Sequence, residues 1–325
     1  MERGVLFPRP AGSPVYAFSS VTGQAAPPIM KLKPIKPLLG LLILLCGCGA
    51  SHDILHENGS TIRSSSDGLY YWYYHAWNGH YHIEVSSSAS PTGPWTQYPT
   101  SILEPDSETF DSRSVACPTV VQEGNTFYML YSGESETGWS IGLAAADQPL
   151  GPWRRVSELI PNFGYVTSVS HHDGRYFMYA ESTQQNDYGP TVVATSFSLL
   201  GPWTIEGVAL PDSVEQWESA GTEGGTVLQI NNRYILFYTG GYYVDDIRLH
   251  AHDAVGVAFS ADGLHFARSL LNPIVSDPSV SIGNVSALRE GGEIYLFYTH
   301  RVDDGAGAHE SLAETVLSVG DIPRK

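Results

Sequence analysis

One stretch decides the fold: Tyr234-Ile235-Leu236-Phe237-Tyr238, an apolar segment dense in aromatic side chains. Segments of this kind occur five times, roughly 50 to 60 residues apart, at 70–74, 127–131, 176–179, 234–238 and 294–298. A second feature keeps step with them, because Gly-Pro-Trp stands at 93–95, 151–153 and 201–203, with a degenerate form at 262–266. A repeat of this length holds four strands, which is one propeller blade. The sequence therefore predicts an all-β fold, a five-bladed β-propeller with four-stranded blades around an axial funnel.

The second repeat shows the expected order of strands within a blade. Residues 118–121 form the inner strand, 127–131 the aromatic strand and 141–146 the third strand, and Trp153 begins the outer strand. The inner strands then start on the face that carries the loops after the aromatic strands, and the Gly-Pro-Trp turns lie on the opposite face. The last repeat ends soon after Leu317, so we expect its outer part to be short or to be completed by residues 53–56. Few helices are expected, because no segment has sustained helical periodicity.

A leader precedes the repeats. Lys31, Lys33 and Lys36 stand before an apolar run at 38–45, which is too short to span a bilayer and suits the core of a signal peptide. The run ends in Leu45-Cys46-Gly47-Cys48, which resembles a bacterial lipobox and makes Cys48 the lipidated residue; an ordinary secretory signal is the alternative.

These features divide the chain. Residues 1–48 are the expected leader, with a possible upstream mis-start at 1–29, a lipoprotein signal peptide at 30–47 and the lipid on Cys48. Residues 49–325 are expected to form one propeller domain. The protein is then expected in a bacterial cell envelope, touching the membrane only through its N-terminal lipid anchor.

The propeller segment is strongly acidic. The whole chain has a formal net charge of -17, and residues 1–47 carry five basic side chains and one acidic one, so that the charge without them is -21. The only lysine after the leader is Lys325, which argues against electrostatic binding of nucleic acid or of an anionic membrane surface. Cys117 is the only cysteine after the leader, so no internal disulfide can form there, and its place on an inner strand predicts a buried side chain.

Comparison of the repeats separates structural from chemical residues. Residues 110–121 align without gaps on 217–228, and an aromatic residue, an acid and a serine open both segments. A feature present in two blades is typical of a loop brace, so Asp111 and Glu218 are interpreted as structural more readily than as catalytic. Glu223 differs, because alanine stands at its counterpart, Ala116.

The first repeat places a second glutamate at the position of Glu223. Aligning Ser60 on Thr226 puts Glu57 on Glu223, in blades one and four. The two carboxylates would then face each other across the axial funnel. Hydrolysis of a glycosidic bond requires such a pair, an acid that protonates the leaving oxygen and a base that activates water. The alternative is that these inner-strand acids bind only solvent or an axial ion.

On these motifs the chain resembles the five-bladed glycosidases of family 43 and their relatives in families 32 and 68. In family 43 the motif of the acid is often Glu-Gly-Pro or Glu-Ala-Pro followed by Gly-x-Tyr-Tyr-Leu, and Glu223-Gly224-Gly225 with 234–238 is similar apart from the proline. The resemblance spans nearly all of the chain after the leader. It implies an inverting glycosidase in which Glu223 is the acid, largely buried at the floor of the funnel, and Glu57 the base.

The departures from that family concern the base. The usual Asp-Pro of the first blade corresponds to Asn58-Gly59, and the carboxylate expected in the second blade corresponds to Thr119. The first blade is more similar to the exo-1,3-galactanase branch, in which a side-chain amide of the last blade is implicated, and Asn284 is its nearest match. The identity of the catalytic base is therefore open. The candidates are Glu57, Asn284 and Asp111, and the remaining alternative is that the protein has no base.

Sugar recognition has its own pattern on the same face. Aromatic rings stack on the C–H face of a sugar, and Arg, His and Asp side chains bond its hydroxyls. The loops on that face carry the candidates Trp77, Trp139, Trp217, Tyr242, His300, Arg301 and Asp111. Each of them alone could serve packing instead.

No cofactor or metal site is assigned from the sequence. The segment His250-Ala251-His252-Asp253 lies in the longest loop, and its alternate histidines could bind a metal, but no third ligand can be named from the sequence. An axial calcium or sodium ion occurs in some relatives and has no signature here. Nucleotide-binding glycine loops, nucleophile elbows and zinc signatures are not found in the sequence.

Three functions remain as alternatives. The first is a monomeric lipoprotein glycosidase that removes terminal arabinofuranosyl, xylosyl or galactosyl units from oligo- or polysaccharides. The second is a non-catalytic glycan-binding lipoprotein that kept the cleft and lost the base. The third is an enzyme like the mannoside phosphorylases, in which phosphate replaces water and for which Arg113, Arg248 and Arg301 are the candidate phosphate ligands.

Overall fold

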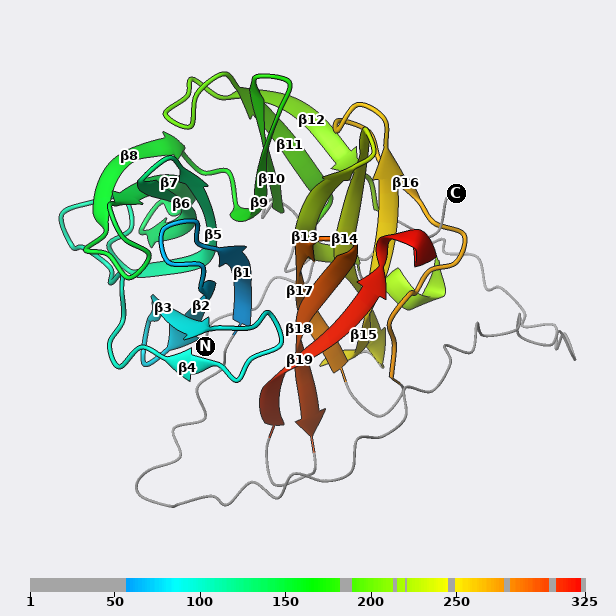
Figure 1. Ribbon diagram of the computed structural model, residues 1–325. Coiled ribbons are helices and arrows are strands. Elements are labelled where there is room, and N and C mark those ends of the chain that lie inside the picture. The colour runs from blue at the N-terminus through cyan, green and yellow to red at the C-terminus, as the bar shows by residue number, and fades with distance from the viewer. Residues whose placement is uncertain are drawn as a thin grey trace, which may run out of the picture. The chain divides into compact units, whose positions relative to one another are not determined.

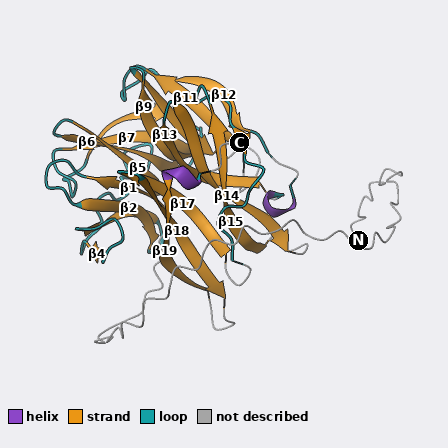
Figure 2. Cartoon of the chain, turned by 45° about the vertical axis from the view of Figure 1, so that its right-hand side comes forward, coloured by secondary structure: helices purple, strands orange, loops and turns teal. Residues whose placement is uncertain are grey.

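A computed structural model describes residues 57–181, 189–212, 215–219, 221–244, 249–277, 281–303 and 308–322 of the chain. All of them belong to one compact unit, Ser51–Lys325. They form five antiparallel sheets arranged in a ring (Figure 1). Within the described ranges the helices are two short 3₁₀ turns, at Gln216–Glu218 and Val319–Asp321 (Figure 2). The predicted five-bladed β-propeller is confirmed, whereas the leader with Cys48 lies outside the described residues.

Each blade is built from strands that are consecutive in the sequence. Blade 1 has β1 (Glu57–Arg63), β2 (Tyr70–Trp77), β3 (Tyr81–Ser88) and β4 (Thr96–Gln97), and blade 2 has β5 (Ser114–Glu123), β6 (Thr126–Ser135), β7 (Gly138–Ala146) and β8 (Arg154–Ile160). Blade 3 has β9 (Tyr165–His172), β10 (Arg175–Glu181), β11 (Thr191–Ser196) and β12 (Thr204–Leu210), and blade 4 has β13 (Gly221–Ile230), β14 (Arg233–Val244), β15 (Leu249–Ser260) and β16 (Ala267–Arg268). Blade 5 has β17 (Ser281–Glu290), β18 (Glu293–Asp303) and β19 (Ala308–Ser318).

The first strand of each blade lies next to the axis. β1 contacts β5, β5 contacts β9, β9 contacts β13, β13 contacts β17, and β17 contacts β1, so that the inner strands close a ring. Blade 5 has three strands among the described residues, and a 3₁₀ turn rather than a strand follows β19. Residues 53–56 lie outside the described chain, so the choice between a short outer part and completion by these residues stays a prediction.

The Gly-Pro-Trp turns join the third strand of a blade to the fourth. Antiparallel pairing places these turns at the opposite end of the sheet from the start of the inner strand, as predicted. Gly151 has φ +94, a conformation that favours glycine. The tryptophan that follows packs on the preceding blade, because Trp153 meets Tyr73 edge-on with ring centroids 6.0 Å apart.

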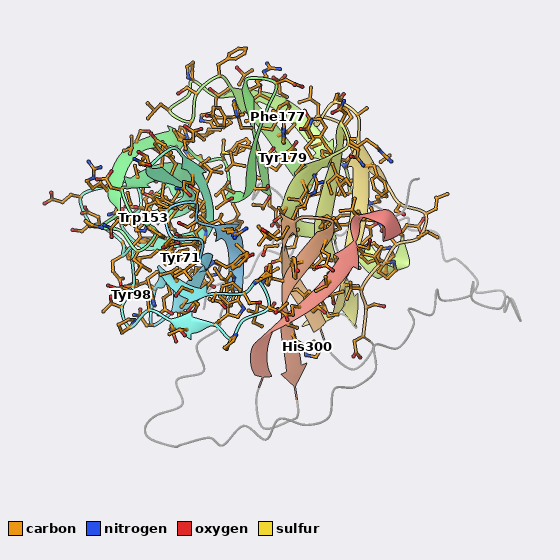
Figure 3. The ribbon with its side chains drawn as sticks, in the orientation of Figure 1. Tyr71, Tyr98, Trp153, Phe177, Tyr179 and His300 are labelled. Carbon is orange, nitrogen blue, oxygen red and sulfur yellow. The ribbon has the colours of Figure 1, made fainter. Side chains whose placement is uncertain are left out.

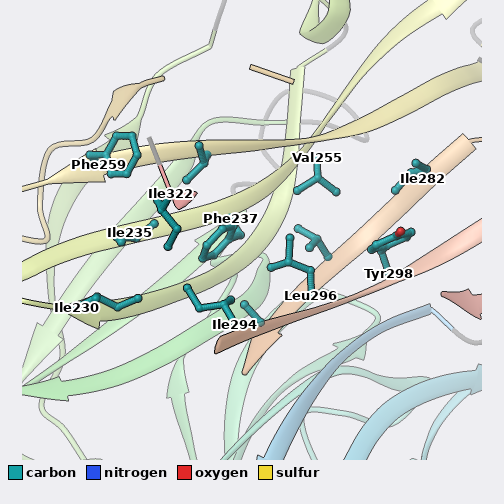
Figure 4. Close-up of a cluster of buried hydrophobic side chains, with 13 residues drawn as sticks. Ile230, Ile235, Phe237, Val255, Phe259, Ile282, Ile294, Leu296, Tyr298 and Ile322 are labelled. Carbon is teal, nitrogen blue, oxygen red and sulfur yellow. The ribbon is translucent and has the colours of Figure 1, made fainter. Parts of the chain in front are cut away.

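The hydrophobic core lies between the blades. Successive side chains of the aromatic strands point to opposite faces of the sheet, so each strand serves two neighbouring blades. Figure 4 shows the cluster between blades 4 and 5, in which Phe237, Val255 and Leu296 are buried. Similar clusters fill the boundaries between blades 1 and 2, 2 and 3, and 3 and 4.

Hydroxyl groups on inner strands bind the backbone of the next blade. Ser60 Oγ accepts a hydrogen bond from Val120 N at 3.0 Å. Two more such bonds are those from Val227 N to Ser168 Oγ at 3.1 Å and from Ala287 N to Thr226 Oγ1 at 3.1 Å. Each contributes about 1 kcal/mol and fixes how far one blade is shifted against the next.

Candidate functional site

The floor of the funnel is a small cavity to which all five blades contribute. Inner-strand residues line it: Gly59, Cys117, Pro118, Val166, Thr167, Gly224, Gly225 and Val285. Its volume of about 10 Å³ has room for about one water molecule. Glu223 directly precedes Gly224 and therefore stands beside this floor.

Strand register confirms that Glu57 and Glu223 occupy equivalent backbone positions. Glu57 pairs with His75 and Glu223 with Thr239, and in both blades the register shifts at the next residue. The side chain of Glu57 lies outside the described part of the chain. Its direction, and its distance from Glu223, therefore stay predictions.

The same backbone position is occupied by other residue types in the remaining blades. Ala116 pairs with Ser132, Tyr165 with Glu181 and Gly283 with Thr299. Blade 2 therefore has alanine where blades 1 and 4 have glutamate. A second carboxylate at this position comes from blade 1 alone.

The carboxylate of Glu223 reaches toward blade 5. Its Oε2 lies 4.0 Å from the point where a Cβ on Gly283 would stand. Glu223 itself is partly buried, less than the largely buried side chain expected. Thr299 Oγ1 lies 3.2 Å from the same point, so residue 283 itself adds no side chain between the carboxylate and this hydroxyl.

Gly59 and Gly225 lie close against their partner strands. A Cβ on Gly225 would collide with the backbone oxygen of Phe237, and one on Gly59 would collide with that of Tyr73. Both inner strands therefore run too close to their aromatic partner strands for any larger residue. Proline is excluded in blades 1 and 4 for the same steric reason.

A ring of buried polar side chains lies one strand outward. The second strand of each blade has a polar residue, at most 8% exposed, just after its aromatic segment: His75, Ser132, Glu181, Thr239 and Thr299. Three of these groups accept hydrogen bonds from the inner strand of the next blade, from Cys117 N to His75 Nδ1 at 3.1 Å, from Val166 N to Ser132 Oγ at 3.0 Å and from Val285 N to Thr239 Oγ1 at 3.3 Å. They satisfy backbone donors next to the strand irregularities that shape the floor.

The sequence analysis missed this ring, although the repeat contains its signal. In four blades one polar residue directly follows the last aromatic position, and in blade 3 Glu181 follows Ala180. Glu181 is the carboxylate of the ring and is 5% exposed. Cys117 is buried as predicted, and its backbone has φ +51.

Asn284 occupies the irregular turn of β17. It has φ +57, as Cys117 does in blade 2, and it lies within the register shift between Gly283 and Ser286. With Gly59, Trp72 and Tyr298 it lines a second cavity of about 10 Å³. The amide is therefore near the start of β1, the strand that carries Glu57.

Tyr165 is a further group on this face that the sequence analysis did not single out. Burial raises its pKa well above the usual range, and the neighbouring Cys117, Glu181 and Glu134 raise it further. Its phenol therefore stays protonated at neutral pH and can donate a hydrogen bond. Trp139 packs against it with ring centroids 4.9 Å apart.

The predicted sugar-contact residues fall into three groups. Trp77, 47% exposed, packs on Tyr81 with ring centroids 4.8 Å apart, and partly buried His300 lies toward the end of β18 (Figure 3). These two, with Trp139, remain candidates at the rim. The side chains of Tyr242 and Arg301, and those of His250, His252 and Asp253, lie outside the described residues. The third group consists of Asp111 and Trp217.

Asp111 and Trp217 belong to buried braces. Asp111 is fully buried, accepts a bond from Tyr131 Oη at 2.8 Å and binds Arg155 Nε through both oxygens. Trp217 packs on Tyr238 with ring centroids 5.9 Å apart. A sugar hydroxyl could reach Asp111 only by displacing these partners, so we place both residues in the structural class that the repeat comparison favoured.

The brace recurs in blade 4. Glu218, also fully buried, accepts a hydrogen bond from Arg268 Nε at 2.8 Å. Phe110 and Trp217 are the aromatic residues of the two braces. The braces occupy equivalent places, which supports a structural role.

Comparison with known proteins identifies the fold. No protein-family model and no curated protein matches the chain. Among solved structures, a thermostable family-43 glycoside hydrolase is 19% identical, covers 83% of this chain and 95% of its own, and has a TM-score of 0.60. The GH43_1 enzyme from Xanthomonas citri complexed with xylotriose is 17% identical over 83% of this chain and 89% of its own, with a TM-score of 0.60.

A phosphorylase shares the same architecture. The β-1,2-mannobiose phosphorylase from Listeria innocua is 14% identical over 82% of this chain and 90% of its own, with a TM-score of 0.62. At such identities these matches show a common fold. The chain therefore has a propeller like those of the family 43 hydrolases, as the sequence motifs predicted.

Proposed function

We propose that the protein is a glycoside hydrolase that cleaves terminal sugars from polysaccharide fragments. The observation that carries this proposal is the position of Glu223, a partly buried carboxylate that stands beside the axial floor and reaches toward Gly283 of blade 5. The register of Glu57 supports a second carboxylate on the opposite side of the axis. The fold shared with family 43 hydrolases is consistent with this chemistry.

In the proposed reaction Glu223 is the general acid. It protonates the glycosidic oxygen as the bond to the anomeric carbon breaks, while Glu57 takes a proton from the attacking water. The product has inverted configuration, and an inverting pair of carboxyl groups stands about 6.5 to 9.5 Å apart. Arabinofuranosyl, xylosyl and galactosyl units are the proposed substrates, and Trp77, Trp139 and His300 would form part of their binding surface.

Phosphorolysis is the second candidate, favoured by the fold shared with a mannobiose phosphorylase. It would require cations beside Glu223. Of the three arginines that the sequence suggested, Arg113 is exposed and pairs with Glu136 at 3.2 Å, whereas the side chains of Arg248 and Arg301 lie outside the described residues. A requirement for phosphate separates this candidate from hydrolysis.

The test is a screen of the purified protein on aryl glycosides of arabinofuranose, xylose, galactose and fructose, and on mannobiose, with and without phosphate. Hydrolysis of an aryl glycoside without phosphate, absent in Glu223→Gln, supports the proposal. Turnover of mannobiose that requires phosphate would support phosphorolysis. Sugar binding without turnover of any substrate would identify a glycan-binding protein.

We also propose that Cys48 carries a lipid and anchors the protein in a bacterial envelope, and that the propeller acts as a monomer. Among the described residues there is no helix with the length and apolar character needed to cross a bilayer. Metabolic labelling with a palmitate analogue, lost in Cys48→Ala, tests the anchor. Light scattering of the purified protein tests the monomer.

A further inference from the structure

Two histidines and a glutamate meet on the outer part of blade 1. One ligand atom from each of His80, His82 and Glu104 lies within 4.8 Å of those of the other two. His80 Nε2 is 2.9 Å from Glu104 Oε2, and His82 Nε2 is 3.1 Å from Glu84 Oε1. These groups are separate from the axial floor and from Glu223.

The strand geometry explains why they meet. Side chains two residues apart lie on the same face of a strand, which places His80, His82 and Glu84 together. Ile83, between them, points to the other face and is buried in the core against blade 2. The backbone of Ile83 also bonds Leu103, with its N 2.9 Å from Leu103 O, and this contact brings Glu104 beside the histidines.

The carboxylates of the cluster are held by further side chains. Gln97 Nε2 donates to Glu84 Oε2 at 2.6 Å, and Ser101 Oγ donates to Glu104. The side chain of His82 is 6% exposed and that of Glu84 12%, whereas His80 and Glu104 face solvent at 40% and 48%. His82 and Glu84 therefore form a buried part of the cluster, in which Gln97 holds the carboxylate. His80 and Glu104 form an exposed part, through which an ion can enter.

We propose that His80, His82 and Glu104 bind a divalent transition-metal ion of the zinc class, with Glu84 beside His82 as the group that holds its ring. Two imidazoles with carboxylate oxygens are a donor set that suits zinc and disfavours calcium and magnesium, which take oxygen ligands. Zinc binds such donors at about 2.0 to 2.2 Å, so small rotations of the exposed His80 and Glu104 side chains would complete the site.

The proposed ion would join two segments of blade 1. His80 lies in the turn between β2 and β3, where Asn78 N donates to its carbonyl at 3.2 Å. Glu104 lies in the segment that leads from blade 1 to blade 2, and its carbonyl accepts a hydrogen bond from Arg155. The ion would therefore fix the turn whose strand ends carry the paired residues Trp77 and Tyr81.

The experiment measures zinc binding by the purified protein after treatment with EDTA and dialysis. Calorimetric titration with zinc chloride and the absorption spectrum of the cobalt-substituted protein report affinity and coordination. The wild type is expected to bind about one zinc per chain and to melt at a higher temperature with zinc. Because His82 is buried, the variants are His80→Asn, Glu104→Gln and the double variant, which alter exposed side chains.

A matched control is His265→Asn. His265 also pairs with a carboxylate, Asp262, at 3.0 Å and is 79% exposed. The control is expected to bind zinc as the wild type does, whereas each site variant should lose at least tenfold in affinity. Failure of the wild type to bind zinc would overturn the proposal, and so would equal binding by the double variant, since the ion would then sit elsewhere.

Discussion

Arg155 of blade 2 binds both oxygens of the fully buried Asp111 carboxylate through its Nε, at 3.1 and 2.8 Å. Glu218 and Arg268 repeat the relationship in blade 4. In each case the arginine stands two residues after the aromatic residue of the turn, Trp153 or Phe266. The pair therefore fixes the outer strand to the segment that enters the same blade.

The variant Arg155→Met should destabilise the protein strongly. It would leave the carboxylate of Asp111 buried without its cation, a change that usually costs about 3 to 5 kcal/mol. Urea unfolding measures the loss. The control is Arg113→Met, whose ion pair with Glu136 is exposed and should matter by less than about 1 kcal/mol. Equal stability of the two variants would contradict the prediction that the buried pair of Arg155 and Asp111 stabilises the fold.

Glu223→Gln should abolish turnover while the fold persists. Glutamine is nearly isosteric but cannot deliver a proton, and a general acid usually contributes a hundredfold or more, roughly 10² to 10⁴. Initial rates on the best aryl glycoside from the screen measure the loss, with sugar binding and melting temperature as checks. Glu158→Gln, on the exposed strand β8, is the control. A loss of less than tenfold would exclude the role of acid.

Glu57→Ala should also be inactive, and azide should restore part of its activity. A small anion can occupy the space of the lost carboxylate and attack in place of the activated water. The rate with and without azide, and the configuration of the product, are the measurements. If Glu57→Ala keeps full activity, the role passes to Asn284, and Asn284→Ala becomes the decisive variant.

Gly225→Ala should be costly although the change is a single methyl group. The added Cβ would collide with the backbone oxygen of Phe237 and push the inner strand away from β14. Overpacking of this kind costs about 1 to 3 kcal/mol. Gly292→Ala, in a turn where a Cβ meets nothing within 4 Å, is the control for the unfolding measurement. If Gly225→Ala left the free energy of unfolding unchanged, the inner strand would be able to move enough to accommodate the methyl group.

The stability of the protein should fall on mild acidification partly through His172. Burial lowers the pKa of His172 from its usual 6.5, and the neighbouring His171 lowers it further. Below about pH 6.5 the unfolded state therefore binds a proton that the folded state does not, and stability is lost until the folded pKa is passed. His172→Gln should lose less unfolding free energy than the wild type between pH 7.5 and pH 5.5, measured in urea. Equal losses would contradict this linkage.

The sequence predicted the features that recur from blade to blade. The aromatic strands, the Gly-Pro-Trp turns and the equivalence of Glu57 with Glu223 all recur in step, so the fold and the backbone position of the candidate acid followed from comparison of the blades. The brace of Asp111 was visible in the same way. Its partner Arg155 has a counterpart in Arg268, so comparison of the blades could also have predicted the two ion pairs.

Other features could not be found in this way. Glu104 joins His80 and His82 because its segment bonds the backbone of Ile83. Blade 4 repeats this backbone contact between Val255 and Val275, but it has Ala254 and Ser276 where blade 1 has His82 and Glu104, so the cluster of side chains does not recur. The exclusion of proline at Gly59 and Gly225 follows from the short distance between two strands, which depends on the whole packing of blades 1 and 4. Sequence comparison detects what recurs between blades, whereas these features belong to single blades or to their spacing.

The hydrogen bonds between a side chain of one blade and the inner strand of the next indicate where the ring opens first. Blades 1 to 5 are joined in order both by the chain and by side chains such as Ser60, Ser132, Ser168 and Thr226 that hold an amide of the following blade. The boundary between blades 5 and 1 has no covalent link and is closed by contacts such as those of Trp95 with Phe297 and of Arg63 with Glu290. This boundary is the seam of the molecule. Amide exchange should start there, and a circular permutant that covalently joins blade 5 to blade 1 should move the weakest point to the boundary that was cut.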